Sequence, residues 1–202
     1  MTLAVADLLP QPRQARSIEK RRRLLDAARA LFGQRGYEAI SIEEITARAG
    51  TASGAFYIYF RSKRQLLLIL MNELLARLAA INLTPSGDLY AFLREALNAD
   101  RESLGAIRAW QEAALVDEEL AAMQRDILRW TEQRILRVLR KLVRRKDADL
   151  PAFARMMDRH FWALLARAGS MSARAFDREV ALAADVIERY AGSRSPRSRS
   201  PR

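Results

Sequence analysis

The stretch that most constrains the fold runs from residue 41 to residue 60 and reads SIEEITARAGTASGAFYIYF. Ser41 followed three residues later by Glu44 forms a capping box, in which each side chain satisfies a free backbone amide of the other residue. A helix is therefore predicted to begin there, and Gly50 is predicted to end it. Apolar residues continue at helical spacing from about residue 52 to residue 60. The stretch thus predicts two short helices joined by a tight turn.

The rest of the chain also follows a helical period. In EKRRRLLDAARALFGQRGY apolar residues recur every three or four positions, and Gly33 and Gly36 are expected to stop that helix. A helix from near Ser62 has apolar residues on every side, so it is expected to connect two cores. Further helices are predicted near 89–102, 104–116, 118–146, 149–168 and 173–191. No segment reads as a strand, and the predicted fold class is all-α.

Positive charge is concentrated in the N-terminal quarter of the chain. The net charge is +11, and residues 13–64 hold twelve Lys and Arg against five Asp and Glu. Such a local excess is typical of a surface that binds a polyanion, because each neutralised phosphate releases condensed counterions. The alternative is an ordinary solvated basic surface. Together with the paired short helices, the charge favours a helix-turn-helix unit that binds DNA.

The chain divides by composition into four predicted segments. These are a flexible arm (1–16), a basic helix-turn-helix domain (17–64), a further helical domain (65–191) and a disordered Ser/Arg-rich tail (192–202). The cluster TPSGD, Thr84–Asp88, is predicted to be a hinge between lobes.

Several function classes are disfavoured. With no cysteine and a single histidine, a metal site is improbable, and no cofactor is expected. An enzyme is disfavoured because the chain has no glycine-rich phosphate loop and no nucleophile elbow. The absence of a secretory signal or a long apolar run predicts a cytoplasmic protein without a membrane partner. The Ser-Arg repeats of the tail leave open an RNA-binding or interaction protein.

The quoted motifs resemble the N-terminal DNA-binding domain of TetR-type transcriptional regulators. The resemblance covers about fifty residues and rests on AARALF and GY, SIEEITARAG, GAFYIYF and KRQLL. It implies a homodimer that binds a palindromic operator and a variable helical domain that senses a small molecule, usually relieving repression.

Carried over by position, the resemblance implies seven DNA-binding residues: Ser41, Ala52, Ser53, Gly54, Tyr57, Tyr59 and Lys63. Ser41 and Lys63 are expected at phosphates, and Tyr57 and Tyr59 at the backbone or bases, although both tyrosines are also compatible with packing on neighbouring helices. The chain departs from the family at Thr51–Ser53, where Val-Ser-basic is common, so Thr51 or Ser53 is expected to cap the recognition helix. Ile40 also stands where threonine is common.

The C-terminal domain carries weaker signals. The candidate ligand-binding residues are Trp110, Met123, Ile127, Trp130, Phe153, Met156 and His160, each of which is also compatible with an ordinary core role. Trp162 falls among charged residues of its predicted helix, which indicates a partner surface or partial burial along arginine stems. Ala183 and Ala184 belong to a run of small residues that lets another helix approach. These three residues are the predicted dimer contacts, in a four-helix interface.

Overall fold

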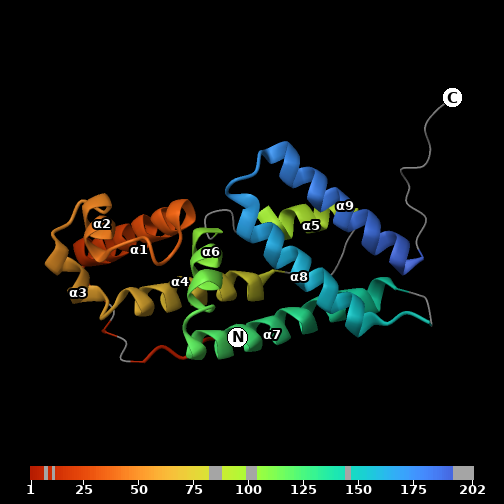
Figure 1. The fold of residues 1–202 in the computed structure, drawn as a ribbon, viewed down its shortest axis with the longest axis horizontal. Helices are drawn as coiled ribbons and strands as arrows, with labels where there is room; N and C mark the ends of the chain where they lie inside the picture. The colour runs from red at the N-terminus through yellow and green to blue at the C-terminus, as the bar shows by residue number, and fades with distance from the viewer. Residues whose placement is uncertain (7–8, 11, 82–87, 99–103, 144–146, 193–202) are drawn as a thin grey trace. The chain divides into compact units, whose positions relative to one another are not determined.

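The structure is a computed structural model that describes residues 1–6, 9–10, 12–81, 88–98, 104–143 and 147–192 (Figure 1). Its elements are α1 (Ala15–Arg35), α2 (Ile42–Arg48), the 3₁₀ turn η1 (Ser53–Ala55), α3 (Phe56–Tyr59), α4 (Lys63–Ala80), α5 (Leu89–Asn98), α6 (Leu104–Ala113), α7 (Glu118–Leu142), α8 (Leu150–Ala168) and α9 (Ala173–Ala191). Over these ranges no strand occurs, so the predicted all-α class is confirmed. No helix in the described ranges has both the length and the apolar character needed to cross a membrane.

The chain packs as two compact units. The first contains the described residues of 1–80 and 100–124, and the second those of 81–99 and 125–202. Helices α4 and α6 therefore pack with the helix-turn-helix elements, whereas the predicted sequence division falls at residue 64. Most of the predicted hinge, 84–87, and most of the predicted tail, 193–202, lie outside the described residues.

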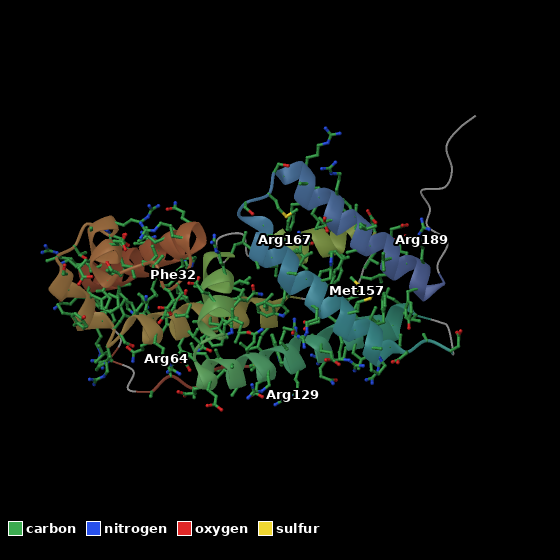
Figure 2. All side chains as sticks on the ribbon, viewed as in Figure 1. Phe32, Arg64, Arg129, Met157, Arg167 and Arg189 are labelled. Carbon is green, nitrogen blue, oxygen red and sulfur yellow. The ribbon has the colours of Figure 1, made fainter. Side chains whose placement is uncertain are left out.

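The first unit is built on buried aromatic and aliphatic side chains from α1 to α4. Phe32, labelled in Figure 2, packs against Tyr37 with ring centroids 5.6 Å apart, and Phe56 packs against Phe60 at 5.3 Å. The predicted capping box at the start of α2 is confirmed: the Glu44 amide donates to Ser41 Oγ at 3.1 Å, and the Ser41 amide donates to Glu44 Oε2 at 2.8 Å. This box fixes where the chain turns into α2.

Helix α1 is longer than the sequence indicated. Gly36, with φ of 85°, ends α1 as predicted, but Gly33 lies within the helix. The reason is a close contact with α6, because the Cα of Gly105 lies only 3.2 Å from where a Cβ on Gly33 would stand. Two glycines thus allow the backbones of α1 and α6 to touch.

Side chains of α6 also secure the end of α1. The carboxylate of Glu112 accepts from the backbone amides of Tyr37 at 2.8 Å and Glu38 at 3.0 Å. Arg108 donates to the carbonyl oxygen of Gly33 at 3.1 Å. Free backbone groups at the end of a helix need such partners. Helix α6 therefore adds partners for backbone groups at and just beyond the end of α1, where Gly36 supplies the local cap.

The second unit combines α5, most of α7, α8 and α9. Asp149 caps α8 by accepting from the Ala152 amide at 3.0 Å, and Ser172 caps α9 by accepting from the Ala175 amide at 3.2 Å. The ring of Phe153 stacks on Tyr190 with centroids 3.8 Å apart, which joins α8 to α9. Met157, labelled in Figure 2, is buried in the same unit.

Candidate nucleic-acid interface

The turn between α2 and the recognition segment is a tight connection that requires glycine. Gly50 has φ of 62°, and its amide donates to the Ala47 carbonyl at 3.0 Å. An L residue rarely adopts that backbone conformation, and a Cβ at this position would lie 2.5 Å from Arg23 Nη2. The turn is therefore set by local sequence and directs η1 and α3 away from α2.

The recognition segment has one buried side and one open side. Phe56 and Phe60 are fully buried and anchor it to the core, while Ala52, Ser53 and Gly54 are exposed. The side chain of Tyr57 is 58% exposed. No side-chain cap is formed at the start of η1, so the expected capping by Thr51 or Ser53 is wrong. The open side offers a phenol and a run of small residues to a partner.

Two residues of the segment differ from the sequence interpretation. Tyr59 is only 9% exposed and belongs to the core side, which favours the packing alternative for this residue over a contact with DNA. Ile58, which the sequence analysis missed, is 67% exposed. The spacing of Phe56 and Phe60 could have predicted the exposure of Ile58. When two residues four positions apart on a helix face the core, the two residues after the first of them face outward.

Ser41 and Lys63 occupy the flanks of the segment in different ways. Ser41 is exposed, and because its Oγ accepts the Glu44 amide, the hydroxyl proton is left to donate outward. Lys63 Nζ instead donates to the carbonyls of Tyr37 and Ile40, both at 2.9 Å, and stands 4.3 Å from the Tyr37 ring centroid. The ammonium of Lys63 thus holds the loop between α1 and α2, with one of its three donors remaining for a phosphate.

A groove of about 450 Å³ lies between the first turns of α1 and the turn after α2. Its lining residues are Arg16, Glu19, Lys20, Arg23, Gly50, Thr51, Ala52 and Ala55. Three cations therefore face one carboxylate, Glu19, whose pKa is lowered chiefly by its hydrogen bond with Arg22. The apolar period of α1 predicts only a core helix and does not indicate this groove, whereas the local excess of positive charge does.

The predicted ligand-binding residues are divided between the two units. Trp110 and Met123 belong to the first unit, and the other five to the second. Trp110 is fully buried and its indole N–H donates to Gln124 Oε1. Met156 is 51% exposed, which corrects its assignment to an interior pocket. His160 Nε2 is buried without a hydrogen-bond partner among the described residues.

The three predicted dimer contacts lie inside the chain. Trp162, Ala183 and Ala184 are all buried, and the Trp162 indole donates to Thr131 Oγ1 at 3.4 Å. The interpretation of Trp162 as a residue on a charged surface is therefore wrong. The neighbouring Asp158 is buried as well, and this burial raises its pKa to about 6. A charged neighbour normally indicates a surface position, but Asp158 is itself buried, so its presence beside Trp162 was misleading.

A short turn joining two helices, an outward recognition segment and an adjoining basic groove together form a helix-turn-helix arrangement, which is typical of DNA-binding domains. Among the described residues, no group of three or more His, Cys, Asp or Glu is placed to hold a metal ion.

Comparison with known proteins gives the family. Residues 24–70 match the sequence model described as "Bacterial regulatory proteins, tetR family". The chain is 38% identical over 69 residues to the HTH-type transcriptional repressor KstR of Rhodococcus jostii (strain RHA1), covering 34% of this chain and 32% of KstR. On these findings residues 24–70 are a TetR-type N-terminal domain.

Solved structures extend the likeness beyond the N-terminal domain. A transcriptional regulator from Rhodococcus sp. RHA1 matches with a TM-score of 0.64 at 20% identity, covering 84% of this chain and 96% of that one. The SmeT–triclosan complex matches with a TM-score of 0.58 at 26% identity, covering 84% and 90%. By sequence, however, the chain spans only about a fifth of the length of several curated relatives, 19 to 22%.

Proposed function

We propose that the protein is a sequence-specific transcriptional regulator that binds a palindromic DNA operator as a homodimer and represses until a small molecule releases it. The observation that carries this proposal is the recognition segment, whose inner side is fixed in the core while Ser53, Gly54, Tyr57 and Ile58 face outward. A rigid segment with an open face is what the major groove admits. Binding to chromosomal DNA requires a cytoplasmic location.

The outward residues divide into two roles. Ser53 and Tyr57 lie four positions apart and so share a face suited to base edges, and the apolar side chain of Ile58 suits a thymine methyl group. Ala52 and Gly54 allow the backbone to approach the duplex closely. Ser41, Arg16, Lys20 and Arg23 lie beside the segment and suit the phosphates, which fix register without reading sequence.

Dimerisation is assigned to the outer faces of α8 and α9. Met156 and Ala163 are exposed seven positions apart on α8, and Leu182 is exposed on α9 with Val186 half-buried four positions later. These spacings place each pair on one helix face. Because α8 and α9 pack together within their unit, the two faces form a surface for a second copy. A four-helix interface of this kind is isologous.

The repressor assignment and the effector rest on relatives. KstR is named a repressor, and the SmeT structure contains triclosan. The effector site is proposed for the helical domain, where Ile127 and Phe153 are buried, Trp130 and His160 are half-buried, and His160 Nε2 is buried without a hydrogen-bond partner among the described residues. The RNA-binding alternative finds no support, because the matching family model is described as one of regulatory proteins and KstR is named a transcriptional repressor.

The test is selection of bound duplexes from a random pool, followed by titration of the selected duplex at a stated salt concentration. We expect a palindrome bound at least a thousandfold more tightly than scrambled DNA, as is typical of specific recognition. The Tyr57→Ala variant is expected to lose about tenfold or more of that affinity without losing thermal stability. Equal binding of selected and scrambled duplexes would rule out a sequence-specific regulator.

A further inference from the structure

Residues 1–6 lie in the first unit, attached to α4, and are called here the N-terminal strap (Figure 1, red end of the chain). The Leu3 amide donates to Asn72 Oδ1 at 2.7 Å, and Asn72 Nδ2 donates to the Leu3 carbonyl at 3.1 Å. Farther along, Gln65 Nε2 donates to the Ala6 carbonyl at 3.0 Å. Residues 3–6 of the predicted flexible arm are therefore held by side-chain amides of α4.

The geometry of these contacts fits an extended peptide. Seven residues of helix separate Gln65 from Asn72, a rise of about 10 Å. Ala6 follows Leu3 by three residues, and three residues of extended chain also span about 10 Å. The distance along α4 between Gln65 and Asn72 thus matches the length of the strap between Ala6 and Leu3. Leu3 lies opposite Asn72, and Ala6 lies opposite Gln65. Both ends are recognised through backbone atoms, which any peptide of this conformation supplies.

One strap side chain adds selectivity. Leu3 is buried, whereas Thr2, Ala4 and Ala6 are exposed. Helical spacing puts Leu68 and Ile69 on the same face of α4 as Gln65 and Asn72, and both of them are buried. The two amides that hold the strap therefore lie on an apolar face of α4, and Leu3 is the buried strap residue beside it.

The strap makes few contacts with α4 for the number of residues that these contacts order. One buried side chain and three hydrogen bonds hold six residues, and ordering each residue has an entropic cost. Segments with so few buried contacts open locally without global unfolding. The strap is therefore a ligand tethered to its own site, favoured by the high effective concentration that a short tether provides.

We propose that α4 carries a peptide-binding groove, formed by Gln65, Asn72 and the apolar face between them, which takes an extended peptide with a leucine side chain and is occupied in cis by the strap. The groove also touches the exit of the recognition segment. Gln65 Oε1 accepts the Arg61 amide at 2.9 Å, so the residue that holds Ala6 also holds the corner between α3 and α4.

The experiment uses the full chain and two matched substitutions, Leu3→Asp and Ala4→Asp. Both add one negative charge to neighbouring residues, but only the first removes the buried side chain. A fluorescent peptide of sequence MTLAVA is titrated into each protein and its anisotropy is measured. We expect saturable binding to Leu3→Asp, at least tenfold weaker binding to wild type and Ala4→Asp, and loss of binding when Asn72→Leu is added to Leu3→Asp.

A second measurement does not depend on the free peptide. Amide exchange of Leu3 is followed by NMR and is expected to be slowed at least tenfold in wild type and Ala4→Asp relative to Asn72→Leu. Equal peptide binding by wild type and Leu3→Asp, no saturable binding to any variant, or an unprotected Leu3 amide in wild type would each overturn the groove. None of these readouts requires DNA, so the result is separate from that of the proposed function.

Discussion

At the scale of single residues, several charged and polar side chains make contacts that their position in the sequence did not predict. Lys63 was expected to reach a phosphate, but its ammonium fastens the carbonyls of Tyr37 and Ile40. Lys20, in contrast, lines the basic groove beside the recognition segment. Of these two lysines, Lys63 therefore stabilises the fold, whereas Lys20 belongs to the proposed DNA interface.

This contrast predicts opposite outcomes for two alanine substitutions. Lys63→Ala is expected to lower the free energy of unfolding by about 2 kcal/mol, because it leaves two carbonyls without their charged donor. Lys20→Ala is expected to leave stability unchanged and to reduce the salt slope of DNA binding by about one. Thermal unfolding and binding isotherms at three or more salt concentrations measure both. A stable Lys63→Ala protein with a reduced slope would assign that residue to the phosphates after all.

Asp158 predicts a pH-dependent stability. Burial raises the pKa of this carboxyl to about 6, against its hydrogen bonds with Thr131 and Trp162 and the nearby Arg159, while Glu132 adds to the increase. The folded state therefore binds the proton more tightly than the unfolded state. The contribution of Asp158 to the free energy of unfolding is complete below about pH 4 and is lost as the pH rises through 6. The loss amounts to about 3 kcal/mol at most.

Asp158→Asn is expected to remove this loss. The variant should unfold at a higher temperature than wild type at pH 7.5 and show little gain at pH 4. Asp126→Asn, which removes an exposed carboxylate of α7, is the control and is expected to change neither value. An identical pH profile for wild type and Asp158→Asn would show that the carboxyl does not titrate in this range.

At the scale of elements, the features that the sequence predicted well are local. The capping box, the turn at Gly50 and the starts of α8 and α9 depend on residues within four positions of one another. The features that it missed depend on partners far along the chain. Trp162 is held by Thr131, 31 positions earlier, and Leu3 by Asn72, 69 positions later. A periodic pattern identifies a buried face but not the element that covers it.

The contact between α1 and α6 is a further long-range feature and predicts a reversal of the usual glycine effect. In a helix interior, Gly→Ala normally stabilises by about 0.5 to 1 kcal/mol. At Gly105 a Cβ would stand 1.9 Å from the Arg29 carbonyl oxygen, so Gly105→Ala is expected to destabilise by at least 2 kcal/mol. Denaturant unfolding measures the difference.

Gly54→Ala is the matched control. A Cβ there meets no atom within 4 Å, so stability is expected to be unchanged, and any loss belongs to DNA binding. Equal unfolding free energies for Gly105→Ala and wild type would mean that α1 and α6 separate readily, contrary to the backbone contact seen here.

At the scale of the whole molecule, a single recognition segment reads only a few base pairs, so useful specificity requires two copies. Two half-sites about 34 to 36 Å apart, one turn of the duplex, are the spacing that a symmetric dimer reads. In the proposed dimer, a ligand would change operator affinity by preferring one arrangement of the two copies, and its effect could not exceed that preference. The proposed surface between the copies is therefore where the recognition segment and the effector site would be coupled.

Adjacent residues of α9 test this surface. Leu182 is 58% exposed and Ala183 is buried, so the same glutamate substitution is expected to act differently at each position. Leu182→Glu should give a folded monomer that has lost the operator complex, because the charge opposes only the contact between copies. Ala183→Glu should instead lower the free energy of unfolding by about 4 kcal/mol or more, because it buries an unpaired charge.

Sedimentation velocity at micromolar concentration, with circular dichroism on the same samples, separates the two effects. A Leu182→Glu protein that remains dimeric would move the interface away from the outer face of α9. A wild-type protein that is monomeric at this concentration and still binds its operator tightly as one copy would end the dimer proposal, since the recognition segment would then suffice without a partner.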